Sequence, residues 1–207
     1  PAALEEASKR LAEEIDYHSY LQYLFFRQWH ALKDYANQRG VQVIGDVPLY
    51  VAHDSADVWA NPQLFLLDER GAPTVVSGVP PDYFSKTGQR WGTPIYKWQD
   101  MARSDYHWWV ERFRWAFRNL DLVVLDHFRG FEGYWEVPAS SPTAAEGRWV
   151  EGPGAPRFQA LQRALGIEAL PCIAEDLGVI TPPVEALRDR FGFPGMRVLQ
   201  FAFDGSP

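Results

Sequence analysis

The sequence has very little cysteine and no long apolar run. Cys172 is the single cysteine among 207 residues, so an internal disulfide is excluded and a reducing compartment such as the cytoplasm is expected. No stretch of about 18 consecutive apolar residues occurs. The charged N-terminal segment PAALEEASKRLAEE lacks the features of a signal peptide. These absences argue against a membrane partner and favour a cytoplasmic protein.

Positive charge and cofactor motifs are scarce as well. The chain carries 20 Lys and Arg against 27 Asp and Glu, a net charge of −7, which does not favour nucleic acid. No GxGxxG follows a strand-like run and no P-loop occurs, so a nucleotide cofactor is disfavoured. The five histidines show no paired spacing such as HExxH. Neither a cofactor nor a metal is therefore expected.

Aromatic residues, in contrast, are abundant. Nine Trp, nine Tyr and thirteen Phe make up 15% of the chain. Any single ring can belong to a well-filled core or can contact a flat, weakly polar ligand such as a sugar. The second alternative is favoured for rings that lie beside Gly, Pro or charged residues, namely Tyr83, Phe84, Trp91, Tyr96, Trp98, Tyr134, Trp135 and Trp149.

Apolar runs alternate with helical patterns along the chain. In order, we expect a helix at 4–39, a strand at 41–51, a helix at 106–120, a strand at 120–126, a helix at 158–166, a strand at 171–178, a helix from 182 to 192 and a strand at 196–203. Such alternation predicts an α/β fold with a parallel sheet covered on both faces. Residues 52–104 and 138–157 lack periodicity and are predicted to be loops.

Acidic residues lie at the C-terminal end of every predicted strand, at Asp46, Asp126, Glu175, Asp176 and Asp204. Chemistry in parallel α/β folds lies at this carboxyl end of the sheet. Clustered carboxylates bind hard cations or transfer glycosyl groups, and the first use is disfavoured because no phosphate cradle accompanies them. Retaining glycosyl transfer needs two carboxyl groups about 5–5.5 Å apart. Neighbouring parallel strands lie about 4.8 Å apart, so Asp126 and Glu175 are the candidate pair.

Several long segments carry a family resemblance. The segments GDVPLYVAHDSADVW, VSGVPPDYFSKTGQRWGTPIY, DHFRGFEGYWEVPA, EGRWV and AEDLGVITPPVEALRDRFGFPGM, in this order, resemble the amylomaltase (4-α-glucanotransferase) family of the α-amylase clan. The resemblance covers roughly residues 15–205. It implies a partial (β/α)8 TIM barrel, about strands three to six, with long active-site loop insertions. Residues 1–207 would be the central part of that catalytic barrel, with 52–104 as the active-site insertion and 138–157 as a second loop.

The resemblance also implies roles for individual residues. Asp126 of DHFRG corresponds to the nucleophile, Glu175 of AEDLG to the acid/base, and Asp46 of GDVP to a substrate-site residue. His127 would donate a hydrogen bond to sugar or carboxylate. The segment 82–92 would lie over the active site and supply sugar contacts from Tyr83, Phe84 and Trp91. Family members act on α-1,4-glucans such as maltooligosaccharides and starch, need no cofactor and are usually cytoplasmic.

Two departures from the family pattern qualify this hypothesis. The family places an Arg two residues before the nucleophile, and here that position is Val124, which cannot orient a carboxylate. The family's third carboxylate, in a T-H-D-N segment, has no counterpart in this sequence. We therefore expect a 4-α-glucanotransferase whose central part, taken alone, is inactive. A non-catalytic glucan-binding protein and an α-glucan hydrolase remain alternatives.

Overall fold

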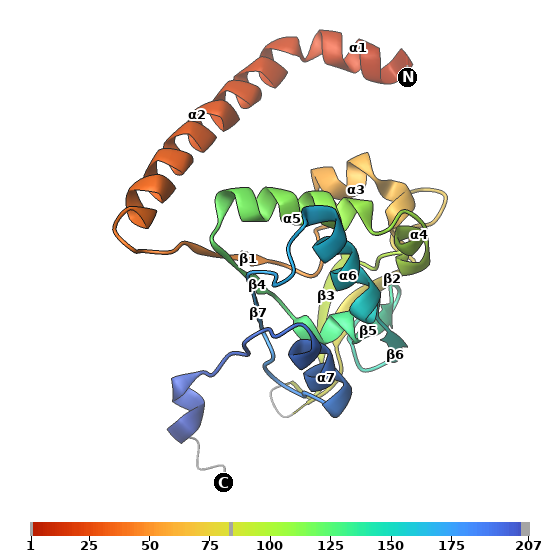
Figure 1. The fold of residues 1–207 in the computed structure, drawn as a ribbon. Helices are drawn as coiled ribbons and strands as arrows, with labels where there is room; N and C mark the ends of the chain where they lie inside the picture. The colour runs from red at the N-terminus through yellow and green to blue at the C-terminus, as the bar shows by residue number, and fades with distance from the viewer. Residues whose placement is uncertain (1, 83–84, 204–207) are drawn as a thin grey trace.

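The computed structural model describes residues 2–82 and 85–203, and its elements follow one another as shown in Figure 1. The α-helices are α1 (Ala2–Arg10), α2 (Ala12–Asn37), α3 (Ala56–Ala60), α4 (Trp98–Arg103), α5 (His107–Asn119), α6 (Gly154–Leu165) and α7 (Pro182–Arg190). The strands are β1 (Ile44–Val47), β2 (Val75–Val79), β3 (Gln89–Pro94), β4 (Leu122–Leu125), β5 (Gly133–Pro138), β6 (Arg148–Glu151) and β7 (Cys172–Ala174). Short 3-10 turns are η1 (Pro62–Leu64), η2 (Phe128–Phe131) and η3 (Leu199–Phe203).

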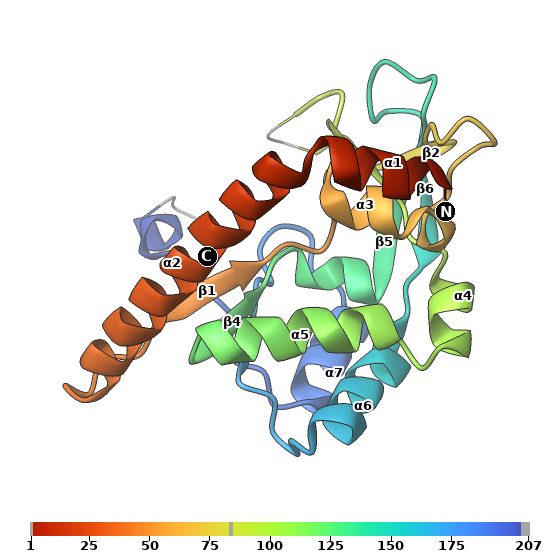
Figure 2. The same ribbon diagram turned by 90° about the horizontal axis from the view of Figure 1, so that it is seen from above.

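The predicted parallel sheet is present, with the strand order β1-β4-β7. Val47 lies opposite Leu125, and Leu125 lies opposite Ala174, so the three strands end at the same edge. One face of this sheet, including Val123, Leu125 and Cys172, is buried in the main core with Trp109 and Phe113 of α5. Helix α5 packs on β4 and on α6, as the view in Figure 2 shows. This is the strand-then-helix arrangement of an α/β barrel segment.

The opposite face of the parallel sheet is only partly covered by the described residues, which corrects the prediction of a sheet covered on both faces. Ile44 is 53% exposed, and Val124 and Ile173 are half-buried. Because side chains alternate along a strand, Val124 shares its face with Asp46, to which it is paired in register. This face therefore carries the acids, and the covered face supplies the core.

A second, antiparallel sheet of order β3-β2-β5-β6 was not predicted from the sequence. It contains strands from both segments that were expected to be loops, so those two predictions were wrong. Val76 of β2 pairs with Val137 of β5, a partner far along the chain. Such long-range pairing leaves no local periodicity, and Gly78 and Gly92 interrupt the apolar pattern of β2 and β3. Residues 52–104 also hold α3, η1 and α4.

The predicted strand at 196–203 is wrong: residues Leu199–Phe203 form the 3-10 turn η3. The backbone follows β7 only briefly, where Ala174 N donates to Pro194 O. The next donor, Met196 N, binds the side chain of Asp176 instead of a strand, so the ladder stops there. Asp204 lies outside the described residues.

The remaining predictions are close to the structure. The helix expected at 4–39 is interrupted at Leu11, the helix at 158–166 begins earlier, at Gly154, and α7 follows Thr181 as expected. The strands are shorter than predicted, and Asp46 is the third of the four residues of β1. Helices α1 and α2 extend away from the body in Figure 1. No helix in the described part of the chain is long and apolar enough to cross a membrane.

Candidate active site

A pocket of about 440 Å³ lies at the carboxyl end of the parallel sheet. Asp126, His127 and Glu175 line it from the parallel sheet, together with Pro48 and Tyr50 after β1. Trp91 and Thr93 line it from β3 of the second sheet. The pocket therefore has an acidic side from one sheet and a ring-bearing side from the other.

Asp126 and Glu175 directly follow neighbouring strands. Leu125 of β4 lies opposite Ala174 of β7, so the next residue of each strand is one of the two acids. The Glu175 N–H donates to Leu125 O at 3.1 Å, which continues the ladder past the last paired residues. The two carboxyl groups also interact electrostatically, since the charge of Asp126 raises the pKa of Glu175. The structure thus brings together the two acids that the sequence identified as a candidate pair.

His127 holds Glu175 through its backbone. Its φ of 47° and ψ of 52° lie in the left-handed region, which costs a residue other than glycine about 1–2 kcal/mol. In this conformation the His127 N–H donates to Oε2 of Glu175 at 2.7 Å. The Phe128 N–H donates to the Glu175 carbonyl at 3.1 Å. The strained turn after one acid therefore orients the other acid.

The environment separates the proton affinities of the two acids. Burial raises the pKa of Glu175 to about 7, and the neighbouring charges of Asp126, Asp46 and Asp176 act in the same direction. The pKa of Asp126 is also raised, by burial and by Asp46, but backbone hydrogen bonds from His127 and Leu49 and the charge of Arg112 oppose the shift. One carboxyl group is therefore suited to hold a proton near neutral pH while the other is ionised.

Asp46 lies beside this pair but is not among the residues that line the pocket. It is exposed near the end of β1, and partial desolvation raises its pKa. Its charge raises the pKa of both Asp126 and Glu175, so it acts on the pair electrostatically. Val124, where the family resemblance predicts Arg, is paired in register with Asp46 on one side and with Ile173 on the other.

The rings of Trp91 and His127 meet edge to face, with centroids 4.8 Å apart. Trp91 is 39% exposed and lines the pocket, and its role as a sugar contact stays a prediction. Burial and the charge of Arg129 lower the pKa of His127 to about 4, so its imidazole is neutral and has one N–H to donate. Tyr83 and Phe84, the other two predicted sugar contacts, lie outside the described residues.

Sequence reasoning missed three residues that line the pocket: Pro48, Tyr50 and Thr93. Tyr50 had a usable signal, because it is a ring two residues after Pro48 and three residues after the end of a strand that carries an acid. Its ring lies 6.4 Å from Trp91 and 6.0 Å from Tyr96. Thr93 had none, since β3 was not predicted. Among the rings singled out from the sequence, Tyr96, Trp98 and Tyr134 are buried core residues.

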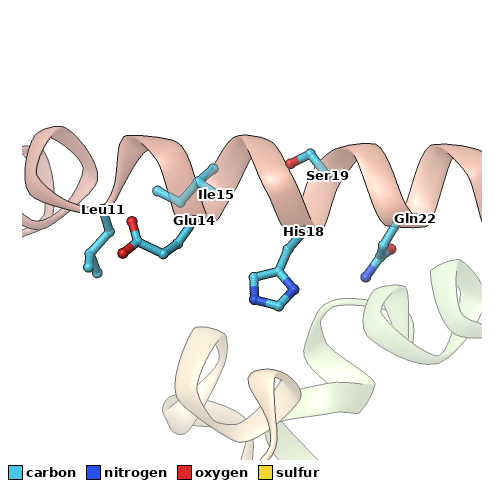
Figure 3. A pocket seen from close by; sticks show the side chains of 6 residues that line it. All are labelled: Leu11, Glu14, Ile15, His18, Ser19 and Gln22. Carbon is cyan, nitrogen blue, oxygen red and sulfur yellow. The ribbon is translucent and has the colours of Figure 1, made fainter.

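A larger groove, of about 690 Å³, lies along α2 and carries no comparable chemistry. Its lining residues are Leu11 and five residues of α2, and Figure 3 shows His18 and Gln22 directed toward neighbouring helices. The groove is the open flank of α2. Among the described residues, no group of three or more His, Cys, Asp or Glu could hold a metal ion.

Comparisons with known proteins agree on one family. A family model described as 4-alpha-glucanotransferase matches residues 1–207. The 4-alpha-glucanotransferase of Thermus thermophilus is 60% identical over 202 residues, which cover 98% of this chain and 40% of that protein. The chloroplastic/amyloplastic 4-alpha-glucanotransferase of Solanum tuberosum is 50% identical over 202 residues, which cover 98% of this chain and 35% of that protein.

Solved structures give the same result for the fold. The amylomaltase of Streptococcus agalactiae in complex with acarbose superimposes with a TM-score of 0.94 at 44% identity, covering 99% of this chain and 41% of that one. The amylomaltase of Corynebacterium glutamicum, at 23% identity and a TM-score of 0.78, shares the fold. The chain thus spans about 40% of the length of the Thermus relative.

Proposed function

Because the chain belongs to the 4-alpha-glucanotransferase family, we propose that the whole protein transfers α-1,4-glucan segments between maltooligosaccharides or starch chains, with retention of configuration. One observation carries the proposal. Asp126 and Glu175 line a single pocket from adjacent strand ends, and the environment favours a proton on the second acid. Retaining transfer needs one carboxylate and one carboxylic acid at the scissile bond. The cytoplasm is the proposed location.

In the first half-reaction, protonated Glu175 gives its proton to the glycosidic oxygen, and the carboxylate of Asp126 attacks the anomeric carbon. The bond from that carbon to oxygen breaks as the bond to Asp126 forms, and the leaving glucan departs with the proton. In the second half-reaction, the ionised Glu175 removes a proton from the hydroxyl of an acceptor glucan. That oxygen displaces Asp126, which restores both carboxyl groups and the original anomeric configuration.

The ring-bearing side of the pocket supplies binding. Trp91 and Tyr50 offer apolar surface to the faces of glucose units, and the neutral His127 ring offers one N–H to a sugar hydroxyl. Asp46, beside the pair, is a hydrogen-bond acceptor for a further hydroxyl. These residues hold a glucan acceptor at the covalent intermediate and so favour sugar over water. No step in this scheme uses a cofactor.

A trapped intermediate tests the proposal. The whole protein with Glu175→Gln is treated with an activated glucosyl fluoride, which forms the intermediate without an acid, and peptides are analysed by mass spectrometry. We expect a glycosyl adduct on Asp126, because the second step lacks its base. The double variant that also carries Asp126→Asn is the matched control and should show none. An adduct on any other residue contradicts the assignment.

Two other functions are distinguished by products. Val124, in place of the family Arg, is the observation that favours a glucan-binding protein without catalysis. Such a protein would bind acarbose, the ligand of the Streptococcus agalactiae structure, but leave maltotriose unchanged. A hydrolase would yield glucose and maltose alone from maltotriose. A transferase yields longer oligosaccharides as well, and these are the expected products.

A further inference from the structure

Arg129 joins the segments that follow the two acids. It belongs to η2, three residues beyond Asp126, and its side chain is almost fully buried. Its Nη1 donates to the carbonyl oxygen of Val179 at 2.5 Å. Val179 lies four residues beyond Glu175, so one side chain bridges the loop after β4 and the loop after β7.

A third element holds the guanidinium in place. The Cζ atom of Arg129 lies 3.9 Å from the centre of the Trp149 ring, which belongs to β6 in the second sheet. A guanidinium stacked on an indole gains cation–π attraction and keeps its plane fixed, so its donors keep their direction. Trp149 in turn meets Trp135 edge to face, with ring centroids 5.3 Å apart.

The motif GRWV, residues 147–150, builds this support. A Cβ at Gly147 would lie 2.2 Å from Nε1 of Trp135, so only glycine leaves room for that ring. Arg148 donates two hydrogen bonds to Oε1 of the buried Glu136, at 2.9 and 2.7 Å, and thereby fixes the pairing of β5 with β6. The motif therefore fixes the position of Trp149, and the Trp149 ring in turn holds the guanidinium of Arg129.

The loop after β7, whose Val179 carbonyl accepts the hydrogen bond from Arg129, is anchored at its start by Asp176. The side chain of Asp176 accepts hydrogen bonds from Nη1 of Arg188 at 2.5 Å and from Met196 N at 2.8 Å. After it the chain turns at Gly178, with φ of 85°, and Val179 is 62% exposed. Little else in the described structure restrains Val179, so the bond from Arg129 is the main anchor at this end.

We propose that Arg129 is a positioning residue that fixes Glu175 relative to Asp126 by clamping the Val179 carbonyl while stacked on Trp149. The role rests on the proposed glucan transfer. The backbone donors that hold Glu175, at His127 and Phe128, precede Arg129 directly. The segment 127–129 therefore binds the chain at two points, at Glu175 through the backbone donors and at Val179 through the Arg129 side chain.

Loss of the clamp should lower kcat of the whole protein and leave substrate binding nearly unchanged. Arg129→Met lowers kcat roughly 10- to 100-fold with KM changed less than about threefold, because misplacement of a reacting group by about 1 Å has this effect. Arg129→Lys keeps the charge but not the planar stack, so its kcat should lie between those of the wild type and Arg129→Met. Trp149→Leu leaves Arg129 intact and lowers kcat in the same direction.

The pH profile separates positioning from general destabilisation. The groups that face Glu175 are Asp126 after β4, Asp46 in β1, Asp176 after β7 and the His127 N–H. That N–H lowers the pKa of Glu175, so weakening it moves the alkaline limb of the rate profile to higher pH. A variant that is merely less stable keeps the limb in place.

Amide hydrogen exchange tests the clamp without reference to activity. Exchange in residues 177–180 should become at least about tenfold faster in Arg129→Met and Trp149→Leu. Arg39→Met is the matched control, because Arg39, just beyond α2, also stacks on a ring, that of Tyr35, at 3.5 Å. This variant should change neither amide exchange in residues 177–180 nor kcat. Unchanged exchange overturns the clamp whether or not the protein transfers glucan. Faster exchange with unchanged kcat overturns the positioning role, and inactivity of the wild-type protein overturns the proposed function alone.

Discussion

At the scale of single residues, the backbone of His127 links the two acids. Its left-handed conformation directs its N–H to Glu175, while Asp126 immediately precedes it in the chain. Burial raises the pKa of both acids, but Asp126 receives more compensating hydrogen bonds. Backbone donors and neighbouring charges thus act differently on the proton affinities of two similar groups, and two predictions follow from this.

The first concerns pH. In the proposed mechanism Glu175 acts as the acid only when protonated, so kcat/KM should fall about tenfold per pH unit above its pKa of about 7. Asp46→Asn removes a negative charge that raises this pKa and should move the alkaline limb to lower pH. The measurement is the pH profile of maltotriose disproportionation by the whole protein. An alkaline limb below pH 5 in the wild type would show that Glu175 is an ordinary carboxylate.

The second concerns Val124, which lies between Asp46 and Ile173 on the face that carries the acids. Val124→Arg places a guanidinium beside Asp46 and Asp126 and should lower the pKa of both. A hydrogen bond to a charged group stabilises by about 1.5–3 kcal/mol, so kcat should rise roughly tenfold or more. The acidic limb should also move to lower pH. If neither quantity changes, Val is tolerated at this position; Val124→Met controls for size.

At the scale of elements, the sequence pattern predicts the helices and strands whose apolar residues recur at regular local spacing. Helices α2, α5 and α7 and strands β1, β4 and β7 follow apolar periodicity, and their order places Asp126 beside Glu175. The second sheet could not be predicted, because β2 finds its partners β3 and β5 through pairing that the local sequence does not encode. The pocket residues Trp91 and Thr93 belong to that sheet, and only Trp91 was found, from its place between Arg90 and Gly92 and from the family resemblance.

Docking of α2 gives a prediction at this scale. Asp121 accepts hydrogen bonds from Lys33 Nζ at 2.5 Å, Asn37 Nδ2 at 2.7 Å and Val43 N at 2.8 Å, and these lower its pKa from 3.8 to about 2. Asp121→Asn should destabilise the protein by about 1–2 kcal/mol and speed amide exchange at the end of α2. In the wild type this contribution is present above pH 4 and is lost as the pH falls toward about 2. Asp16→Asn in α2 is the control, because Asp16 makes no such hydrogen bonds within the described part of the chain.

At the scale of the whole molecule, one core joins the parallel sheet to α5 and α6, and it contains a buried cation. Arg157 is fully buried, with its Cζ 3.9 Å from the centre of Phe131 and 4.1 Å from Phe158. Its three guanidinium nitrogens have no hydrogen-bond partner among the described residues. Burial lowers its pKa to about 9, so the group is charged at neutral pH. The rings offset only part of this cost.

Stability should therefore rise when this charge is removed. Arg157→Met keeps a long side chain of similar shape, and we expect a gain of about 1–3 kcal/mol in the free energy of unfolding, measured by urea titration. Arg163→Met on the same helix, where Arg163 is exposed and pairs with Asp105, should change stability by less than about 1 kcal/mol. A loss of stability in Arg157→Met would mean that the rings fully compensate the buried charge.

The pocket is shared between two sheets that differ in kind. The proposed nucleophile Asp126 and acid/base Glu175 directly follow parallel strands, whereas Trp91 and Thr93 belong to the antiparallel strand β3. If the proposed glucan transfer holds, substitutions in β3 should change which glucan lengths the pocket accepts and leave the two acids unchanged. Evolution, or an engineer, could tailor product size on β3 without retuning either acid.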